Sequence, residues 1–167
     1  MQHPKEENEI KFKPIGIVHT NASDDEVRRK VPGQESTIEI YPEFEEALDG
    51  LAEFSHIFVL GYFNRLRPEQ IGPLKVRPRG LLKRGLKLEE LPLIGVLALD
   101  SPTRPNPIGL SLVPVVKLEK TQIVVTGLDL FDGTPVLDIK PYQASYRAEG
   151  FKLSSWHAKL AEKAGHV

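Results

Sequence analysis

Short apolar runs rich in strand-forming residues recur along the chain, and no long helical pattern separates one run from the next. Residues 36–41 alternate apolar and polar side chains at period two, while residues 56–63 are continuously apolar, which is typical of a central strand. Because many short strands follow one another, the sequence predicts a mainly β fold, a single-sheeted closed or nearly closed β-barrel. Further strands are expected at residues 15–20, 94–99, 112–118, 122–128 and 136–139.

Two segments favour helix within this β framework. Residues 42–48 open with a proline and carry acidic side chains in the first turn, which favours a short helix. Ser154 can cap a C-terminal helix, whose apolar face should pack on the barrel or on a partner. That face consists of Trp156, Leu160 and Ala164. The polar segment 21–33 contains proline and glycine and is predicted to be a loop.

The composition excludes several classes of protein. The 167 residues suit one domain, and a net charge of -1 means that a nucleic-acid-binding surface would have to be local. The absence of cysteine excludes disulfides, zinc–thiolate sites, iron–sulfur clusters and a cysteine nucleophile. The five histidines have no paired metal-ligand spacing, so we expect no metal. No run approaches the roughly 18 apolar residues of a membrane span, and the charged start is unlike a signal peptide, so a cytoplasmic protein is expected.

The densest chemical signal is the stretch at residues 101–111, Ser-Pro-Thr-Arg-Pro-Asn-Pro-Ile-Gly-Leu-Ser. Its prolines fix the backbone angle φ, so the loop is rigid before any ligand arrives. Arg104, Asn106 and Ser111 then suit a preorganised binding wall, because little ordering entropy remains to be lost on binding. A rigid crossover between two strands explains the same pattern equally well.

A second signal lies at residues 127–142, where Asp132 and Gly133 predict a tight turn between two strands. Backbone N–H groups in such a turn can hold a ligand, although an ordinary hairpin accounts for the same residues. Asp129 and Asp138 are additional acids in an otherwise apolar pair of strands. They are either solvated on the outer face or placed to attract a cationic cofactor such as a sulfonium.

Together the two stretches resemble the TsaA-like (TrmO-type) family of S-adenosylmethionine-dependent tRNA methyltransferases. Members carry an Arg-Pro-Asn-Pro-Ile-Gly loop and an Asp-Gly-Thr-Pro turn followed by Asp-Ile-Lys-Pro-Tyr, and further segments match in family order at 15–18, 50–57 and 76–79. The resemblance implies a β-barrel that binds S-adenosylmethionine and methylates threonylcarbamoyl-adenosine beside the tRNA anticodon, usually as a homodimer with the cofactor near the subunit interface. It divides the chain into an N-terminal extension, a barrel domain and a helical tail, at residues 1–13, 14–142 and 143–167.

The family's cofactor contacts match several places in this chain. The resemblance implies a cofactor site made of Pro32, Gln34, Leu110, Asp132, Gly133, Thr134 and Pro135. The chain also departs from the family pattern: Gly33 stands in place of an arginine, Asn64 and Arg65 in place of His-Gln, and Asp100 in place of another arginine. The last exchange removes a multi-donor guanidinium and adds an acceptor. Arg65 is a candidate to restore the positive charge.

Positive charge gathers between residues 65 and 87, in a protein that is otherwise nearly neutral. Such a segment suits contacts to tRNA phosphates, whereas few aromatic side chains are present for base stacking. A solvated loop is the alternative interpretation. The candidate RNA-binding residues are Arg67, Lys75, Arg77, Arg79, Lys83 and Arg84.

The sequence does not assign a catalytic residue. Asp138, Lys140 and Tyr142 adjoin the Asp-Gly-Thr-Pro turn and are candidates for removing a proton from an acceptor nitrogen, although each also suits a structural role. Two other functions stay open. One is a non-catalytic barrel paralogue that binds an adenosine-type ligand, and the other is a methyltransferase with a different acceptor.

Overall fold

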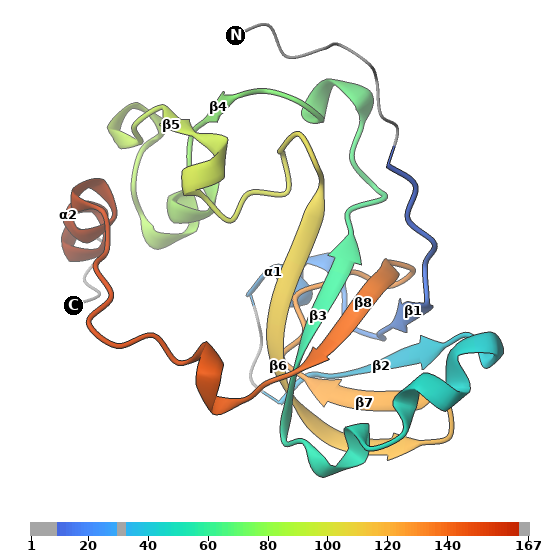
Figure 1. The fold of residues 1–167 in the computed structure, drawn as a ribbon. Helices are drawn as coiled ribbons and strands as arrows, with labels where there is room; N and C mark the ends of the chain where they lie inside the picture. The colour runs from blue at the N-terminus through green and yellow to red at the C-terminus, as the bar shows by residue number, and fades with distance from the viewer. Residues whose placement is uncertain (1–9, 30–32, 164–167) are drawn as a thin grey trace, which may run out of the picture.

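The computed structural model describes residues 10–29 and 33–163, and within them six antiparallel strands close into one barrel (Figure 1). The strands are ordered β1-β2-β7-β6-β3-β8 around the barrel, and β8 pairs with β1 to close the sheet. They are β1 (Gly16–His19), β2 (Glu35–Ile40), β3 (His56–Tyr62), β6 (Ile108–Glu119), β7 (Gln122–Thr126) and β8 (Pro135–Pro141). The predicted mainly β fold, with one closed sheet, short helices and a C-terminal helix, is confirmed.

The interior of the barrel is filled by the inward-facing side chains of these strands. Along β2 and β3, buried positions alternate with more exposed ones, as the period of a strand requires. The inward side chains are mostly β-branched, and the complete burial of each contributes roughly 1.5–3 kcal/mol. The set with no exposed surface is Val18, Ile38, Ile57, Val59, Val113, Ile123, Val125 and Val136.

Strand β6 alternates in the same way but carries apolar side chains on both of its faces. Gly109, Ser111 and Val113 face the interior. On the outer face, Leu110 is 64% exposed and Leu112 is 47% exposed. The outer face of β6 is therefore an apolar row that no described part of the chain covers.

A short α-helix lies in the connection between β1 and β2, where the sequence predicted a loop. This helix, α1, spans Asp24–Arg29 and begins with a capping box formed by Ser23 and Glu26. The Ser23 N–H donates to the Glu26 carboxylate at 2.8 Å, and the Glu26 N–H donates to the Ser23 hydroxyl at 3.4 Å. The loop prediction is therefore wrong over α1. The short helix expected at 42–48 is present as the 3-10 helix η1 (Pro42–Leu48), which is followed by η2 (Leu51–Glu53).

Between β3 and β6 the chain leaves the barrel and forms a small lobe (Figure 1). Its two-stranded sheet pairs β4 (Lys75–Val76) with β5 (Ile94–Gly95). The strand expected at 94–99 is wrong beyond Gly95, because the Val96 N–H donates to the Leu74 carbonyl at 2.9 Å and the chain then turns into a 3-10 helix. The 3-10 helices of the lobe are η3 (Pro68–Gln70), η4 (Arg79–Arg84), η5 (Leu88–Glu90) and η6 (Val96–Ala98).

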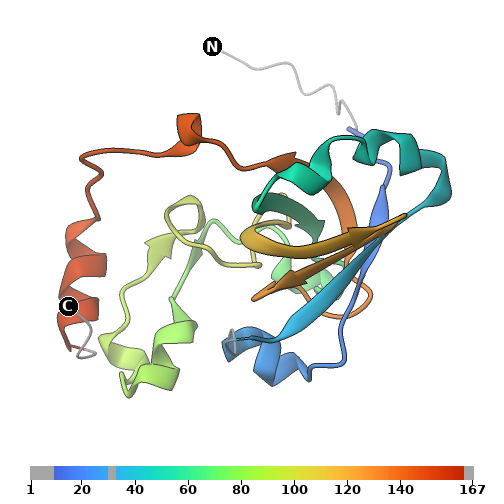
Figure 2. The same cartoon turned by 90° about the horizontal axis from the view of Figure 1, so that it is seen from below.

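After η7 (Ala144–Tyr146) the tail crosses to this lobe and ends in α2 (Ser155–Lys163), as two views show (Figures 1 and 2). Ser154 caps α2 through a 3.4 Å hydrogen bond from the His157 N–H to its hydroxyl. The apolar face packs on the lobe and not on the barrel, which corrects the prediction; Ala164 lies outside the described residues. The contact is a separate cluster of Leu81, Leu86, Leu91, Trp156 and Leu160. No helix of the described residues has the length and apolar character needed to cross a membrane.

Candidate functional site at the loop end of the barrel

Several connections of the barrel meet at one of its ends. Because neighbouring strands are antiparallel, the segments after β1, β3 and β7 lie at the same end as the segments before β2, β6 and β8. We call this the loop end of the barrel. It gathers residues 20–34, 63–65, 100–107 and 127–134, of which 30–32 lie outside the described residues. The proline-rich stretch and the Asp-Gly turn are therefore at the same end of the molecule.

A cavity of about 600 Å³ opens at the loop end. Arg104 and Leu110, from the proline-rich stretch and the start of β6, belong to its lining, as do Asp129 and Leu130 from the segment after β7. Phe63, which follows β3, also lines it. The size and the mixture of polar and apolar groups lie within the range of pockets for small organic ligands. The proline-rich stretch and the segment after β7 thus form one cavity, although the Asp-Gly turn itself, residues 132–135, is not part of its lining.

Two glycines allow the floor of this cavity to pack closely. A Cβ atom on Gly109 would lie 2.6 Å from the Cζ atom of Phe63, and one on Gly61 would lie 2.6 Å from the Cδ1 atom of Leu130. Both distances are shorter than carbon atoms tolerate, so a side chain at either position would force Phe63 or Leu130 to shift. Phe63 and Leu130 are thereby held against the wall of the barrel, where they shape the cavity.

The charged groups of the cavity are the carboxylates of Asp100 and Asp129 and the guanidinium of Arg104. The hydroxyl of Ser111, which is only 7% exposed, donates a hydrogen bond to the Oδ1 atom of Asp129. The two residues are 18 positions apart in the sequence, and their pairing was not predicted. A buried serine on a strand does not by itself indicate such a pair, because the hydroxyl of Ser36 in β2 is also buried and has no hydrogen-bond partner among the described residues.

The Asp-Gly turn is joined to Gln34 through Thr20. The Thr20 N–H donates to the Oδ1 atom of Asp132 at 3.1 Å, and the side-chain amide of Gln34 donates to the Thr20 hydroxyl at 3.4 Å. Gly133 has a φ of 76°, in the left-handed region that glycine adopts without strain, and its N–H donates to the Val18 carbonyl at 2.8 Å. The structure therefore brings Gln34 and the turn together.

Asn64 and Arg65, which depart from the family pattern, are both bonded to the same turn. The Asn64 side-chain amide donates to the Gly133 carbonyl at 3.2 Å, and the Arg65 guanidinium donates to the Asp132 carbonyl. The Arg65 guanidinium also lies 5.5 Å from the centre of the Phe131 ring. These contacts fix the turn from the side of β3.

The other predicted cofactor residues occupy different positions. Leu110 lies on the cavity wall, and Pro32 lies outside the described residues. Thr134 is buried, and its carbonyl accepts a hydrogen bond from the Val18 N–H at 3.0 Å. Pro135 pairs with Ile17 at the start of β8.

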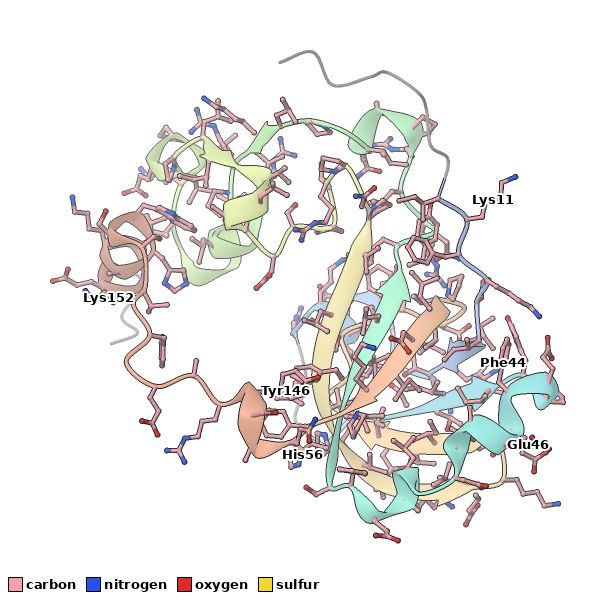
Figure 3. The ribbon with its side chains drawn as sticks, in the orientation of Figure 1. Lys11, Phe44, Glu46, His56, Tyr146 and Lys152 are labelled. Carbon is pink, nitrogen blue, oxygen red and sulfur yellow. The ribbon has the colours of Figure 1, made fainter. Side chains whose placement is uncertain are left out.

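The three candidate catalytic residues lie away from this cavity, on β8 and just after it. Asp138 lines a second cavity, of about 420 Å³, beneath η1 and η2. Its carboxylate forms a 2.7 Å hydrogen-bonded ion pair with the Lys140 ammonium. That hydrogen bond, together with the attraction between the charges, raises the pKa of Lys140. Tyr142 packs against His56 and Tyr146. Figure 3 shows these two partners at the end of β3 opposite the loop end. The structure does not bring these residues to the loop end.

The basic segment is divided by the structure into different environments. Arg67 pairs with Glu69 at 3.1 Å, and the Arg77 guanidinium donates to the carbonyl of the buried Leu91. Lys75 in β4 and Arg79 at the start of η4 are exposed. The remaining two candidates have side chains outside the described residues, namely Lys83 and Arg84. All three residues Lys75, Arg77 and Arg79 are exposed, and Arg77 has a structural contact in addition.

The fold and the cavity define a small closed-barrel protein with a ligand-sized site at one end. The family model for the tRNA-methyltransferase O N-terminal domain matches residues 26–147, and the chain belongs to this family. A relative from Methanothermobacter thermautotrophicus, named a probable S-adenosyl-L-methionine-binding protein, is 42% identical over 147 residues, which are 86% of this chain and 97% of the relative. The mouse tRNA (adenine(37)-N6)-methyltransferase is 40% identical over 121 residues, which are 72% of this chain and 26% of that enzyme.

Solved structures give the same assignment. A crystal structure of TrmO has a TM-score of 0.64 and 32% sequence identity, covering 86% of this chain and 63% of that one. TrmO from Pseudomonas aeruginosa has a TM-score of 0.65 and 28% identity, covering 88% of this chain and 62% of that one. The chain therefore spans a little under two thirds of the TrmO chains whose structures it matches.

Proposed function

We propose that this protein is an S-adenosylmethionine-dependent methyltransferase that acts on threonylcarbamoyl-adenosine next to the anticodon of tRNA. The observation that carries the proposal is the cavity that the proline-rich stretch forms with Asp129 and Leu130 at the loop end. Membership of the TrmO family supports it, as do relatives named for S-adenosylmethionine binding and for methylation of tRNA adenine 37.

The lining of the cavity fits the chemistry of S-adenosylmethionine. That ligand has a carboxylate, positively charged groups and a flat base, and Arg104 suits the carboxylate while Asp129 suits positive charge. Phe63 and Leu97 offer apolar surface to the base. The proposed cofactor contacts are Pro32, Gln34, Leu110, Asp132, Gly133, Thr134 and Pro135. Of those that the structure describes, only Leu110 lines the cavity, whereas the others belong to the Asp-Gly turn or are bonded to it through Thr20.

The protein's part in the reaction is to orient the reactants and to exclude water. When bound, S-adenosylmethionine supplies an electrophilic methyl group to the acceptor nitrogen. The hydrogen bonds of Thr20, Asn64 and Arg65 hold the Asp-Gly turn before any ligand arrives, so a ligand that contacts the turn needs to order it little. The positions of Asp138, Lys140 and Tyr142 away from the cavity give no support to a catalytic role for them.

The tRNA would approach the loop end across the lobe. Lys75 and Arg79 are exposed there, and the lobe connects directly to both β3 and β6, which end and begin beside the cavity. Basic side chains at such a position suit phosphate contacts that hold the anticodon arm without reading its sequence.

A homodimer would form through the outer face of β6. Leu110, Leu112 and Val116 are 64%, 47% and 50% exposed, and an apolar row of this kind is typical of a surface that another protein covers. Because Leu110 also lines the cavity, dimerisation through this row would place the cofactor near the interface.

A non-catalytic binding protein is the second candidate, and Asp100 favours it. Asp100 lines the cavity at the position where the family has an arginine, so the pocket loses a strong donor to carboxylates. A chain changed in this way could retain an adenosine-type ligand without transferring a methyl group. A methyltransferase with a different acceptor is a third possibility that the same cavity accommodates.

The test combines binding and transfer. Calorimetry should detect binding of S-adenosylmethionine, and radiolabelled methyl groups should appear in host tRNA that carries threonylcarbamoyl-adenosine. Transfer into other nucleic acids or small molecules, but not into this tRNA, would support the different acceptor. Binding of adenosine nucleotides with no transfer to any acceptor would support the binding protein, and a chain that binds no adenosyl ligand would overturn the proposal.

A further inference from the structure

Four aromatic rings gather on the outer side of the barrel, near the start of β3. Phe58 contacts Tyr146 edge-on, with the ring centres 5.0 Å apart, and it contacts Tyr142 in the same way at 5.7 Å. Tyr142 and Tyr146 stack with their planes 25° apart and their centres 6.2 Å apart, and His56 meets Tyr142 edge-on at 6.4 Å. Contacts of this kind hold each ring in a defined orientation. We call His56, Phe58, Tyr142 and Tyr146 the aromatic cluster.

The aromatic cluster is open to solvent on one side. Tyr146 is 47% exposed and His56 is exposed, whereas Ile57 and Val59, which alternate with the cluster along β3, are buried in the core. Because the two tyrosine planes are nearly parallel, a planar group on the exposed side of Tyr146 would extend their stack. Every nucleobase offers such a planar face, and stacking of bases on aromatic side chains tolerates any sequence.

The register of the strands connects the aromatic cluster with the loop-end cavity. Phe58 lies opposite Leu112 of β6, and Leu110, two residues away along β6, lines the cavity. Two residues of a strand span about 7 Å, and successive phosphates of a stacked nucleic-acid strand are about 3.4 Å apart along its axis. An RNA whose target nucleotide occupies the cavity would therefore bring unpaired nucleotides a few positions away to the cluster.

The charge beside the aromatic cluster suits a nucleic acid better than an apolar protein surface. Arg147 directly follows Tyr146 and is exposed, and its guanidinium forms no ion pair within the described residues. Lys140, opposite Phe58 on β8, is also exposed but pairs with Asp138. A nucleotide brings a phosphate to the Arg147 guanidinium, whereas an apolar partner would take that charge out of water without a counterion.

We propose that the aromatic cluster is a stacking site for an unpaired base of RNA, with the base on Tyr146 and its phosphate on Arg147. The inference rests on the proposed function for the identity of the RNA, and it adds a second contact to a tRNA that the lobe would also hold. The homodimer proposed through β6 would border this site, because Leu112 lies beside Phe58. The site would hold single-stranded RNA without reading its sequence.

The experiment measures binding of a fluorescently labelled oligouridylate by anisotropy, because this probe has no adenine that could occupy the cofactor's place. Tyr146→Leu removes the ring but keeps an apolar side chain, so its affinity should be at least about fivefold lower than that of the wild type. Tyr146→Phe keeps the ring and should bind as the wild type does. Arg147→Gln should reduce the slope of log affinity against log salt by about 0.7.

Phe151→Ala is the matched control and should bind the probe as the wild type does. Phe151 is 74% exposed and takes part in no aromatic contact among the described residues. A measurement on the wild type keeps the test independent of any variant's folding. The ring-proton resonances of Tyr142 and Tyr146 should shift when oligouridylate is added, and those of Tyr41, which precedes η1, should not.

Equal affinity of the wild type and Tyr146→Leu, or a wild type that binds no oligouridylate, would overturn the stacking site. A dimeric wild type that becomes monomeric in Tyr146→Leu would also overturn it, because the cluster would then belong to the interface between two copies. These results leave the proposed function in place, since that function is tested by S-adenosylmethionine binding and methyl transfer. A chain that binds oligouridylate but no adenosyl ligand would instead overturn the proposed function and leave the stacking site.

Discussion

The Nη1 atom of Arg65 lies 3.1 Å from the Oδ1 atom of Asp24, so the segment after β3 is tied to helix α1. The same guanidinium donates to the Asp132 carbonyl and lies over the Phe131 ring, against which Arg28 of α1 also packs at 4.8 Å. One side chain thus joins three connections of the loop end. The segments that follow β1, β3 and β7 are thus held to one another at the loop end.

Replacing Arg65 by alanine should loosen these connections. The variant loses a hydrogen bond, a half-exposed ion pair and a cation–π contact, which together correspond to about 1–2 kcal/mol of unfolding free energy. Urea denaturation measures this loss, and amide exchange should quicken at Thr20, whose N–H is bonded to Asp132. Arg67→Ala is the control, because Arg67 pairs only locally with Glu69 and Gln70 among the contacts described. Equal denaturation midpoints for the two variants would contradict the role given to Arg65.

A methyl group at Gly61 should disturb the floor of the cavity. The added carbon would meet Leu130 at 2.6 Å, and overpacking of a close-packed core costs about 1–3 kcal/mol. Thermal unfolding should therefore occur at a lower temperature in Gly61→Ala. Gly95→Ala provides the comparison, because no heavy atom lies within 4 Å of the equivalent position and its φ is -58°. A Gly61→Ala protein as stable as Gly95→Ala would show that Leu130 moves aside easily.

A charge on the outer face of β6 should prevent dimerisation. Leu112 lies in the middle of the exposed apolar row, and burying an aspartate there in an interface would leave an unpaired charge. Sedimentation should report a dimer for the wild type and a monomer for Leu112→Asp. Leu74→Asp, at a leucine that is 74% exposed in the lobe, should remain dimeric. A monomeric wild type would refute the proposed homodimer.

Neutralising Lys75 or Arg79 should weaken tRNA binding without changing affinity for the cofactor. Each lost phosphate contact should reduce the slope of log affinity against log salt by about 0.7–0.9. Lys117→Gln, on the part of β6 distant from the loop end, is the control for a change of net charge. Filter binding at several salt concentrations gives the slopes. If all three variants bind tRNA alike, the lobe does not contact it.

The Lys140 ammonium should titrate above its ordinary value of about 10.5, because Asp138 accepts its hydrogen bond and attracts its charge. Because folding raises the pKa of Lys140, the ion pair stabilises the folded protein fully at pH values below the pKa of the unfolded chain. This stabilisation is lost as the pH rises through the pKa of the folded protein. The window is therefore alkaline, above about 10.5. A carbon-13 titration of the lysine side chains measures the shift, which Asp138→Asn should abolish. A Lys140 midpoint that is the same in the wild type and in Asp138→Asn would contradict this.

The strands were predictable because their burial follows a period that the sequence displays directly. In β2 the buried residues alternate with more exposed ones, and β3 is a continuous apolar run, so nothing distant is needed to recognise either strand. Helix α1 was missed although its capping box stands in the sequence, because the proline and glycine after it outweighed Ser23 and Glu26 in the prediction. When a helix-starting signal and a loop signal stand next to each other in the sequence, only the packed structure shows which of them determines the backbone.

The candidate site was predictable in part. The proline-rich stretch and the Asp-Gly turn have local signatures, and antiparallel pairing places both at the loop end. The bond between Ser111 and Asp129 depends on the closure of the barrel, which brings together residues from β6 and from the segment after β7. The contact of Arg77 with Leu91 likewise depends on how the lobe folds, so its structural role could not be distinguished from RNA binding by charge alone.

With α2 packed on the lobe, the molecule consists of two units of unequal stability, the barrel and the lobe with α2. The barrel is closed by continuous strand pairing around a core of completely buried residues, while the lobe has a two-stranded sheet and one small leucine–tryptophan cluster. Opening the lobe exposes little apolar surface, so it costs far less free energy than opening the barrel. The exposed basic residues therefore belong to the unit that opens more easily, and because Leu97 of the same lobe lines the cavity, such opening would also change one side of the cavity.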